Sequence, residues 1–347
     1  MKIAFFLILP LFFLSCDKTP EDEQFPKQVP SEPGIYILNE GIWGQNNSSL
    51  QFFSVTTGLL SGDLKTGVLG EPLGDTGNSM TIDGSLGLIS VTSSNKLVWF
   101  DLNSGTIKKS YKFSTDSSPR EALIGPDEMI YISSFYQHQI LVINPSTQTV
   151  INSIPVDPYP ENLASDGENL YVSCNGMGSG RTVMKIPFQN TEAKISISVP
   201  QNPDKLVSSP TGLLVYCQGN LWEAQPKSRI VKIDRISNMI SDSLDPEMPV
   251  KSVCEAGSGK ISVTTDDAVF IVNSDLSITD TLVDRKKLNF KGKIVYQTCF
   301  DAKTGWFWVT TTDAYTVRGW LEAFHNGNRV AGPVQVGINP GSLLVKP

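Results

Sequence analysis

The sequence predicts an all-β, seven-bladed β-propeller, and two observations carry this prediction. Short runs of Val, Ile, Tyr and Phe alternate with Gly, Asn, Asp and Pro along the body of the chain, which is the pattern of strands and turns. A strand, a loop and a second strand then recur in seven units, about every 40 to 50 residues. This period, with four short strands in each unit, is typical of propeller blades.

The chain begins with a pattern typical of a secretory signal. Lys2 precedes an apolar run, "IAFFLILPLFFL", which is too short for a spanning helix and is followed by Ser15 and Cys16. A cysteine directly after a small residue resembles a bacterial lipobox, so we expect residues 1–15 to be removed and Cys16 to be lipidated. The alternative is an ordinary signal peptide with a chance cysteine. Lipid chains contribute about 0.8 kcal/mol per buried methylene, so a lipidated Cys16 would anchor the protein to a membrane.

A tether is expected over residues 16–33, which contain "DKTPEDEQFPKQVPSEP". Proline and acidic residues dominate this segment, and it has too little apolar surface to fold. The propeller is therefore expected to occupy residues 34–347. The net charge of -7 argues against sequence-independent nucleic-acid binding, which needs a basic face.

The repeats are aligned on the second residue of one strand in each unit. That strand is the first of the two in pairs such as "MIYISS" and "QILVIN", or "NLYVSC" and "TVMKIP". The aligned positions are Tyr36, Leu88, Tyr131, Tyr171, Leu214, Ser262 and Trp308.

A third element precedes this strand and usually opens with proline, as in "SPREALI", "YPENLAS" and "NPDKLVS". We interpret it as the innermost strand of each blade. Its last copy, "NPGSLLV", has no blade after it, whereas the first unit has no such strand before it. The segment from Ser342 to Val345 is therefore expected to complete the N-terminal blade and close the ring, which leaves no open sheet edge at the join.

The loops after the aligned strands and the loops entering the innermost strands should share one face. They bring together Trp43, Phe135, Tyr136, Tyr159, Trp222 and Tyr315, with Met177 and Arg181 nearby. The strand openings place Arg120, Glu161, Asp204 and Lys251 around the channel mouth. Aromatic side chains above mixed charges suit a large ligand with apolar faces and polar edges, or a protein partner. The alternative is that the aromatics pack under their own loops and that the charges pair across blades.

Catalytic motifs are weak. The two histidines, His138 and His325, belong to distant units, and a solvated loop histidine explains His138 better than a metal ligand does. We find no legible Ser/His/Asp arrangement, phosphate loop or calcium loop. Glu40 and Asp75 are a candidate carboxylate pair near the first blade, at a separation that the sequence leaves open. The prediction is a protein that is not an enzyme and has no cofactor or metal.

Four cysteines remain after Cys16, all in strand-like contexts: Cys174, Cys217, Cys254 and Cys299. Buried free thiols are the preferred interpretation. A disulfide remains open because exported proteins meet oxidising conditions.

The blades, with "LYVS" followed by "VxVID" or its equivalents, resemble the YVTN-repeat propellers of the YncE type from Ile35 to Val345. The segments "LNEGIWGQNNSSL" and "GDTGNSM" are similar to the start of the BtuG-type surface lipoproteins of Bacteroidetes, which bind vitamin B12 and pass it to a TonB-dependent outer-membrane transporter. This resemblance implies a cobalamin ligand, with Trp43, Asn46 and Asn47 at the ligand face. It places Asp75 and Asn78 at the opening of the first innermost strand.

The expected location is the outer membrane, on the cell surface, with a periplasmic orientation left open. Two other functions remain as alternatives: a propeller scaffold that docks a protein partner in the cell envelope, and a hydrolase or lyase of envelope glycans.

Overall fold

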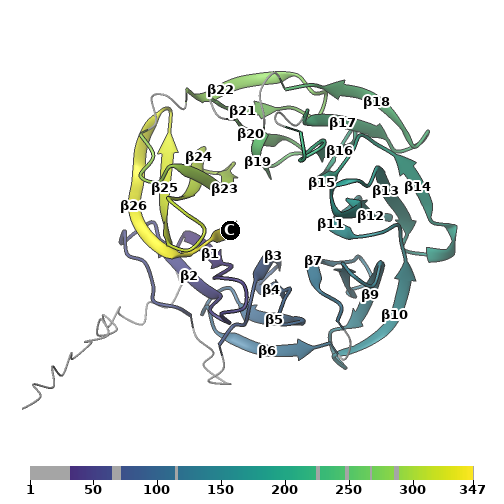
Figure 1. Cartoon of the computed structure of the whole chain (residues 1–347), viewed down its shortest axis with the longest axis horizontal. Helices are drawn as coiled ribbons and strands as arrows, with labels where there is room; N and C mark the ends of the chain where they lie inside the picture. The colour runs from purple at the N-terminus through teal and green to yellow at the C-terminus, as the bar shows by residue number, and fades with distance from the viewer. Residues whose placement is uncertain are drawn as a thin grey trace, which may run out of the picture.

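The computed structural model describes residues 32–64, 72–113, 116–223, 227–246, 250–265, 268–284 and 289–346. Within them, seven antiparallel sheets stand around a central channel like the blades of a propeller (Figure 1). The predicted fold is therefore confirmed. The predicted signal peptide, the lipidated Cys16 and nearly all of the tether lie outside the described residues.

The blades follow one another around the ring in chain order, and the first strand of each four-stranded blade faces the channel. Blade 1 contains β27 (Pro340–Val345), β1 (Gly34–Asn39) and β2 (Ser49–Ser54). Blade 2 contains β3 (Gly77–Asp83), β4 (Leu86–Val91), β5 (Lys96–Asp101) and β6 (Ile107–Lys112). Blade 3 contains β7 (Pro119–Ile124), β8 (Ile130–Ser134), β9 (Gln139–Asn144) and β10 (Thr149–Pro155).

Blade 4 contains β11 (Pro160–Ser165), β12 (Asn169–Cys174), β13 (Thr182–Pro187) and β14 (Ile195–Ser198). Blade 5 contains β15 (Pro203–Ser209), β16 (Gly212–Cys217), β17 (Arg229–Asp234) and β18 (Met239–Leu244). Blade 6 contains β19 (Val250–Glu255), β20 (Ile261–Thr265), β21 (Ala268–Val272) and β22 (Ile278–Asp284). Blade 7 contains β23 (Ile294–Asp301), β24 (Trp306–Thr312), β25 (Arg318–His325) and β26 (Asn328–Ile338). Short 3₁₀ turns cover Gly176–Gly178 and Thr191–Ala193. The described residues include no helix that is long and apolar enough to cross a membrane.

The core lies between the flat faces of neighbouring blades. The middle strands are buried on both faces, which explains why "GIYIL" and "LGLISV" read as almost continuous apolar runs. Between blades 1 and 2, the ring of Tyr36 lies 4.9 Å from that of Phe52 and 5.2 Å from that of Phe100. The hydroxyl of Tyr36 donates a 2.6 Å hydrogen bond to the carbonyl of Leu102. Such packing holds adjacent blades in fixed positions, so the loops at their ends are held by a rigid frame.

The ring closes in blade 1, as the repeat pattern predicts. Strand β27 pairs antiparallel with β1, with Ile35 opposite Val345 and Asn39 opposite Pro340. Just before β27, the side-chain amide of Asn339 donates to the carbonyls of Gly41 (2.8 Å) and Tyr315 (2.9 Å). The first and last blades are thus joined by side-chain as well as backbone hydrogen bonds.

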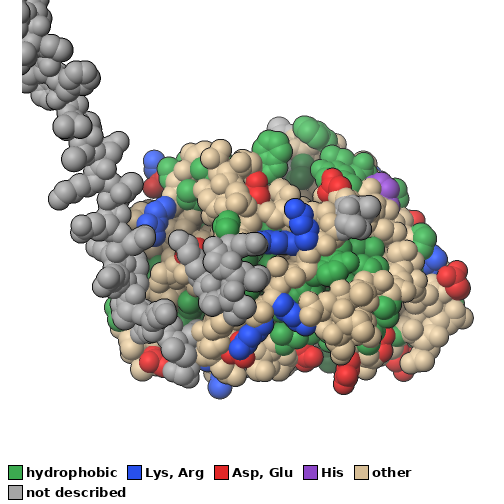
Figure 2. All heavy atoms as spheres, turned by 90° about the horizontal axis from the view of Figure 1, so that it is seen from below, with side chains coloured by type: hydrophobic (Ala, Val, Ile, Leu, Met, Phe, Trp, Pro, Cys, Tyr) green, Lys and Arg blue, Asp and Glu red, His purple; other side chains and the backbone are tan. Residues whose placement is uncertain are grey.

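The two faces of the ring differ in construction. On the turn face, tight hairpins join the first strand of a blade to the second, and the third to the fourth. On the loop face, longer connections join the second strand to the third and enter the next innermost strand. Figure 2, a side view, shows hydrophobic and acidic side chains gathered at opposite edges of the ring.

Candidate functional site

The innermost strands share a local distortion at the channel mouth. In blades 2 to 7 the pairing of the innermost strand shifts register at the second or third residue, as in a β-bulge. Several strands are preceded by a non-glycine residue with positive φ, and these residues are Thr76, Ser118, Tyr159, Asn202 and Asn339. Bulges redirect side chains and are frequent beside functional sites. One position per blade lies beside such a register shift, namely Asn78, Arg120, Glu161, Asp204, Lys251, Tyr296 and, in blade 1, Gly341. All of them except Arg120 line the channel.

The position in blade 1 is filled from another segment. Gly341 has no side chain, and a Cβ atom there would overlap with Oε1 of Glu40. The Glu40 carboxylate comes from the loop after β1 and accepts a 3.0 Å hydrogen bond from the hydroxyl of Tyr296. Burial raises the pKa of Glu40, while the Tyr296 hydrogen bond opposes that shift. The glycine therefore makes room for an ionisable group at the mouth.

The mouth carries fixed charges of both signs. The Arg120 guanidinium lies 2.7 Å from Oε1 of Glu161, whose other oxygen accepts a 3.1 Å hydrogen bond from Asn175. Asp204 accepts a 2.9 Å hydrogen bond from the amide of Gln218. Burial, with the nearby charge of Glu161, raises the pKa of Asp204 to about 6. These groups form a polar surface that is already oriented for a ligand.

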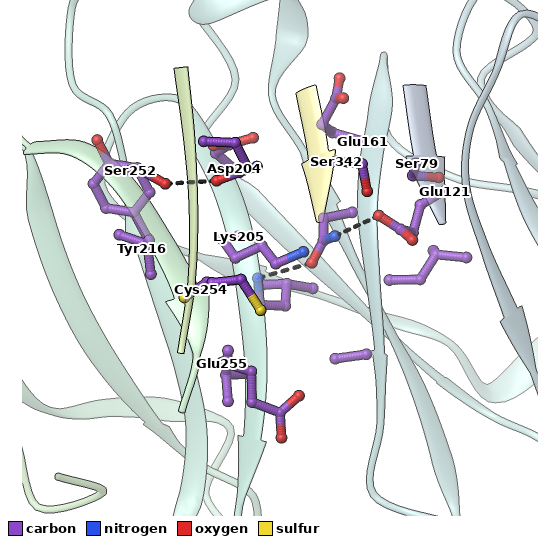
Figure 3. A pocket seen from close by; sticks show the side chains of 18 of the residues that line it. Ser79, Glu121, Glu161, Asp204, Lys205, Tyr216, Ser252, Cys254, Glu255 and Ser342 are labelled. Carbon is purple, nitrogen blue, oxygen red and sulfur yellow. Dashed lines mark hydrogen bonds between the residues drawn. The ribbon is translucent and has the colours of Figure 1, made fainter. Parts of the chain in front are cut away.

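Below the mouth, the channel encloses about 1060 Å³. Figure 3 shows Glu161 and Asp204 near one end of its wall, with Lys205, Cys254 and Glu255 progressively further along it. Glu121 accepts hydrogen bonds from Thr81 (3.1 Å) and Asn162 (2.9 Å).

Burial raises the pKa of Glu121, and the charge of Lys205 opposes that shift. The wall therefore continues the polar character of the mouth.

Three predicted aromatics form one cluster between blades 3 and 4. The ring of Phe135 lies 5.1 Å from that of Tyr136 and 5.0 Å from that of Tyr159. The Arg120 guanidinium lies 5.3 Å from the Phe135 ring, so this cluster borders the charged mouth. His138 accepts a 3.0 Å hydrogen bond from the backbone N–H of Tyr159 through Nδ1 and packs edge-on against its ring, which gives it a structural role.

Trp43 lies at the tip of a loop that is tied down on both sides. The backbone N–H of Gly44 donates to Oδ2 of Asp75 (2.7 Å), and that of Ile42 donates to Oδ1 of Asn47 (2.8 Å). The indole is 81% exposed. Asp75 and Asn47, predicted as ligand contacts, thus also fix the loop that presents Trp43.

Trp222 borders a smaller pocket of about 290 Å³ between the loops of blades 4 and 5. Met177, Gly178 and Leu221 contribute to its wall, with three amides, Asn175, Asn202 and Gln218. The indole is 89% exposed. Because Gln218 also contacts Asp204, this pocket adjoins the main channel.

The remaining predicted residues lie on the loop face or at the mouth, each in its own setting. Tyr315 lies 6.0 Å from the ring of Tyr296, Asn46 is exposed beside Trp43, and Arg181 is exposed and donates to Gln201 (2.8 Å). Asn78 lines the channel and donates to the carbonyl of Arg120 (2.8 Å). Phe135, Tyr136 and Tyr159 are thus brought into contact, while Trp43, Trp222 and Tyr315 stay on separate loops.

Sequence reasoning missed several residues of the mouth and the wall. These are Tyr296, Gly341, Glu121, Lys205, Asn202, Gln218 and Leu221. The signal for Tyr296 and Gly341 was present, since Tyr296 opens the innermost-strand segment "YQTCFDA" and Gly341 is the third residue of "NPGSLLV". Among the residues that the structure describes, no group of three or more His, Cys, Asp or Glu side chains is arranged to hold a metal ion.

The four cysteines of the folded body are free thiols. Cys174 and Cys217 are buried, as expected. Cys254 and Cys299 are only partly buried and line the channel.

Comparison with known proteins identifies the fold. No protein-family model matches the chain, and no curated protein matches it. A quinonprotein alcohol dehydrogenase-like protein from Bacteroides thetaiotaomicron is 12% identical, with a TM-score of 0.66 over 92% of this chain and 79% of that one. A protein from Lactobacillus plantarum is 11% identical, with a TM-score of 0.64 over 91% of this chain and 100% of its own.

Enzymes are also among the similar structures. Virginiamycin B lyase from Staphylococcus aureus, solved with quinupristin, is 13% identical, with a TM-score of 0.56 over 88% of this chain and 96% of its own. At such identities the likeness establishes the propeller fold and leaves the chemistry open. The fold therefore does not argue against catalysis.

Proposed function

We propose that the loop face binds a broad ligand of the corrinoid class and delivers it to a TonB-dependent outer-membrane transporter. The observation that carries this proposal is that exposed aromatic side chains and oriented polar groups occur together at the channel mouth. Exposed aromatic side chains stand around an oriented ring of carboxylates, amides and a guanidinium. A corrinoid is a disc with an apolar plane and amide edges, so it would engage both kinds of surface.

The polar groups suit the edges of such a ligand. Primary amides need both donors and acceptors, and the mouth offers acceptors at Glu161 and Asp204 and donors at Lys251 and Asn78. Because these side chains are held by the frame of the propeller, binding would cost little ordering entropy. A site oriented in advance favours tight binding.

The resemblance of the first loop to the BtuG-type lipoproteins supports the same ligand. The predicted lipid on Cys16 and the predicted tether would place the loop face near a membrane-embedded partner. We therefore propose an outer-membrane lipoprotein at the cell surface. Its task in this proposal is capture and delivery, without catalysis.

Titration calorimetry of cyanocobalamin into residues 34–347 tests the ligand. We expect binding, and a loss of at least about 10-fold in affinity on Trp43→Ala, because an aromatic hot spot contributes about 2 kcal/mol or more. Ile236→Ala is the matched control, since Ile236 is a 92% exposed apolar side chain on the turn face. Unchanged affinity in the Trp43 variant, or no binding of any corrinoid, would contradict the proposal.

A protein-docking scaffold is the second candidate. The observation in its favour is that exposed Trp and Tyr side chains are spread over several blades, as in the hot spots of protein interfaces: Trp43, Tyr136, Trp222 and Tyr315. Affinity capture from detergent-solubilised membranes separates the two candidates. Co-purification of a TonB-dependent transporter supports the first, whereas a different specific partner, lost on Trp222→Ala, supports the second.

A further inference from the structure

Two cysteines lie side by side on the channel wall. Cys254 belongs to β19 and Cys299 to β23, the innermost strands of blades 6 and 7, which are neighbours in the ring (Figure 1). Both residues line the channel. Two residues before Cys254, Ser252 donates a 2.6 Å hydrogen bond to the side chain of Gln297, and Thr298 donates a 3.0 Å bond back to Ser252. These contacts fix the two strands relative to each other, so that Cys254 and Cys299 lie at the same height along the channel.

The thiols contact each other. The nearness of the two thiols lowers the pKa of Cys254 and raises that of Cys299. Sγ of Cys254 also lies 2.8 Å from the hydroxyl oxygen of Ser262. The hydroxyl of Ser262 and the neighbouring thiol thus both contact the Cys254 sulfur, and its lowered pKa favours Cys254 as the nucleophile of the pair.

The other two cysteines provide an internal contrast. Cys174 and Cys217 are 1% and 0% exposed and lie on second strands, away from the channel wall. Burial raises the pKa of both thiols, that of Cys217 to about 12. Buried thiols of high pKa are inert. Among the four cysteines of the described residues, reactivity is therefore expected only at Cys254 and Cys299.

We propose that Cys254 and Cys299 form a reversible disulfide that joins blades 6 and 7 inside the channel. The oxidant is a small-molecule disulfide, because the channel of about 1060 Å³ admits small molecules and excludes a folded oxidase.

In the first step, the Cys254 thiolate attacks a sulfur of this molecule, forms a mixed disulfide and releases one thiolate. The Cys299 sulfur then loses its proton, attacks Cys254 Sγ and expels the second thiolate. Two protein thiols are oxidised, one small disulfide is reduced, and the released thiolates take up the protons.

The predicted export signal supports this inference, since exported proteins meet oxidising conditions. The inference does not depend on the identity of the ligand. Its consequence is a channel wall whose chemistry follows the redox state of its surroundings. The reduced form presents two thiols on the channel wall below the mouth, whereas the oxidised form presents a cross-link between the two blades.

The test is oxidation of the folded full chain with oxidised glutathione, followed by peptide mapping. We expect a single linkage between the peptides that contain Cys254 and Cys299, with Cys174 and Cys217 still free. Dithiothreitol should restore both thiols. Absence of any reaction in the folded protein, or glutathione adducts on both residues without a linkage, would overturn the proposal.

Single variants test the order of the steps. Cys299→Ser should stop at a glutathione adduct on Cys254, which adds one glutathione to the mass. Cys254→Ser should slow the reaction of the remaining Cys299 at least about 10-fold, since its pKa is raised by burial as well. Cys174→Ser is the control and should oxidise like the unchanged chain. Equal reactivity of the two single variants would overturn the assignment of Cys254 as nucleophile.

Discussion

The turn face and the loop face differ most clearly in how their carboxylates are used. On the turn face, Asp101 accepts hydrogen bonds from the backbone N–H groups of Asn103 (3.1 Å) and Ser104 (2.8 Å), and these bonds lower its pKa. On the loop face and in the channel, burial raises the pKa of Glu40, Glu121 and Asp204. The turn-face carboxylate stabilises its hairpin, whereas burial of the carboxylates on the loop face and in the channel costs stability. Groups held at a cost to stability are frequent at functional sites.

Asparagines with positive φ occur on both faces, and replacing one on each face should give the largest expected difference in the free energy of unfolding. Asn339→Ala should lower the free energy of unfolding by about 3 kcal/mol, because it adds backbone strain and removes two hydrogen bonds across the ring closure. Asn326→Ala, in an exposed hairpin with φ of 49°, should cost about 1 kcal/mol, since it adds the same strain and removes only one exposed hydrogen bond, to His325 Nε2 (3.0 Å). Urea unfolding of both variants measures the difference. Equal losses would show that the side-chain bonds of Asn339 do not stabilise the closure.

Asp204→Asn probes the raised pKa at the mouth. Between the ordinary value of 3.8 and about 6, folded Asp204 keeps a proton that the unfolded chain releases. Its contribution to stability therefore falls as the pH rises through this window, by about 2 kcal/mol after allowance for partial exposure. The difference between wild type and Asp204→Asn, measured by urea unfolding at pH 4, 5, 6 and 7, should follow this slope. A difference that is constant with pH would contradict the assignment.

Asp101→Asn should give the smallest effect and the opposite sign. A lowered pKa contributes stability above the ordinary value of 3.8, and that contribution disappears as the pH falls through the folded pKa. The asparagine side chain still has an oxygen that can accept the hydrogen bonds of the turn, so the loss in the free energy of unfolding at pH 7 should stay below about 1 kcal/mol. The difference in unfolding free energy between the two proteins should then shrink as the pH is lowered below 3.8. A pH-dependent loss like that of Asp204 would remove the distinction between the two faces.

The fold was predictable because its signals are local and repeated. A strand such as "NLYVSC" buries both faces, and the copies at regular spacing identify the blades without knowledge of long-range contacts. The closure was predictable as well, since "NPGSLLV" lacks a following blade. Only the register of pairing between β1 and β27 required the structure.

The site was less predictable because it depends on contacts between distant segments. Glu40 and Tyr296 are far apart in the sequence, and no local pattern indicates that Gly341 leaves space for the Glu40 carboxylate. Trp43 could be placed on the loop face from its position after a strand, whereas the hydrogen bond between Gly44 and Asp75 could not. Local patterns thus identified the exposed aromatics and the charged strand openings at the mouth, and missed the hydrogen bonds that join those charges to residues such as Asn175 and Gln218.

The shared first blade has a consequence for synthesis. The innermost strand of that blade, β27, follows all the other described strands in the chain, so a ribosome must make the other six blades before the first blade can receive it. Until then, β1 has an open edge and β23 lacks its neighbour on that side. A polypeptide that stops short of Pro340 therefore exposes two unprotected surfaces at once. A chain interrupted before β27 is therefore left open to proteases and to pairing with other chains.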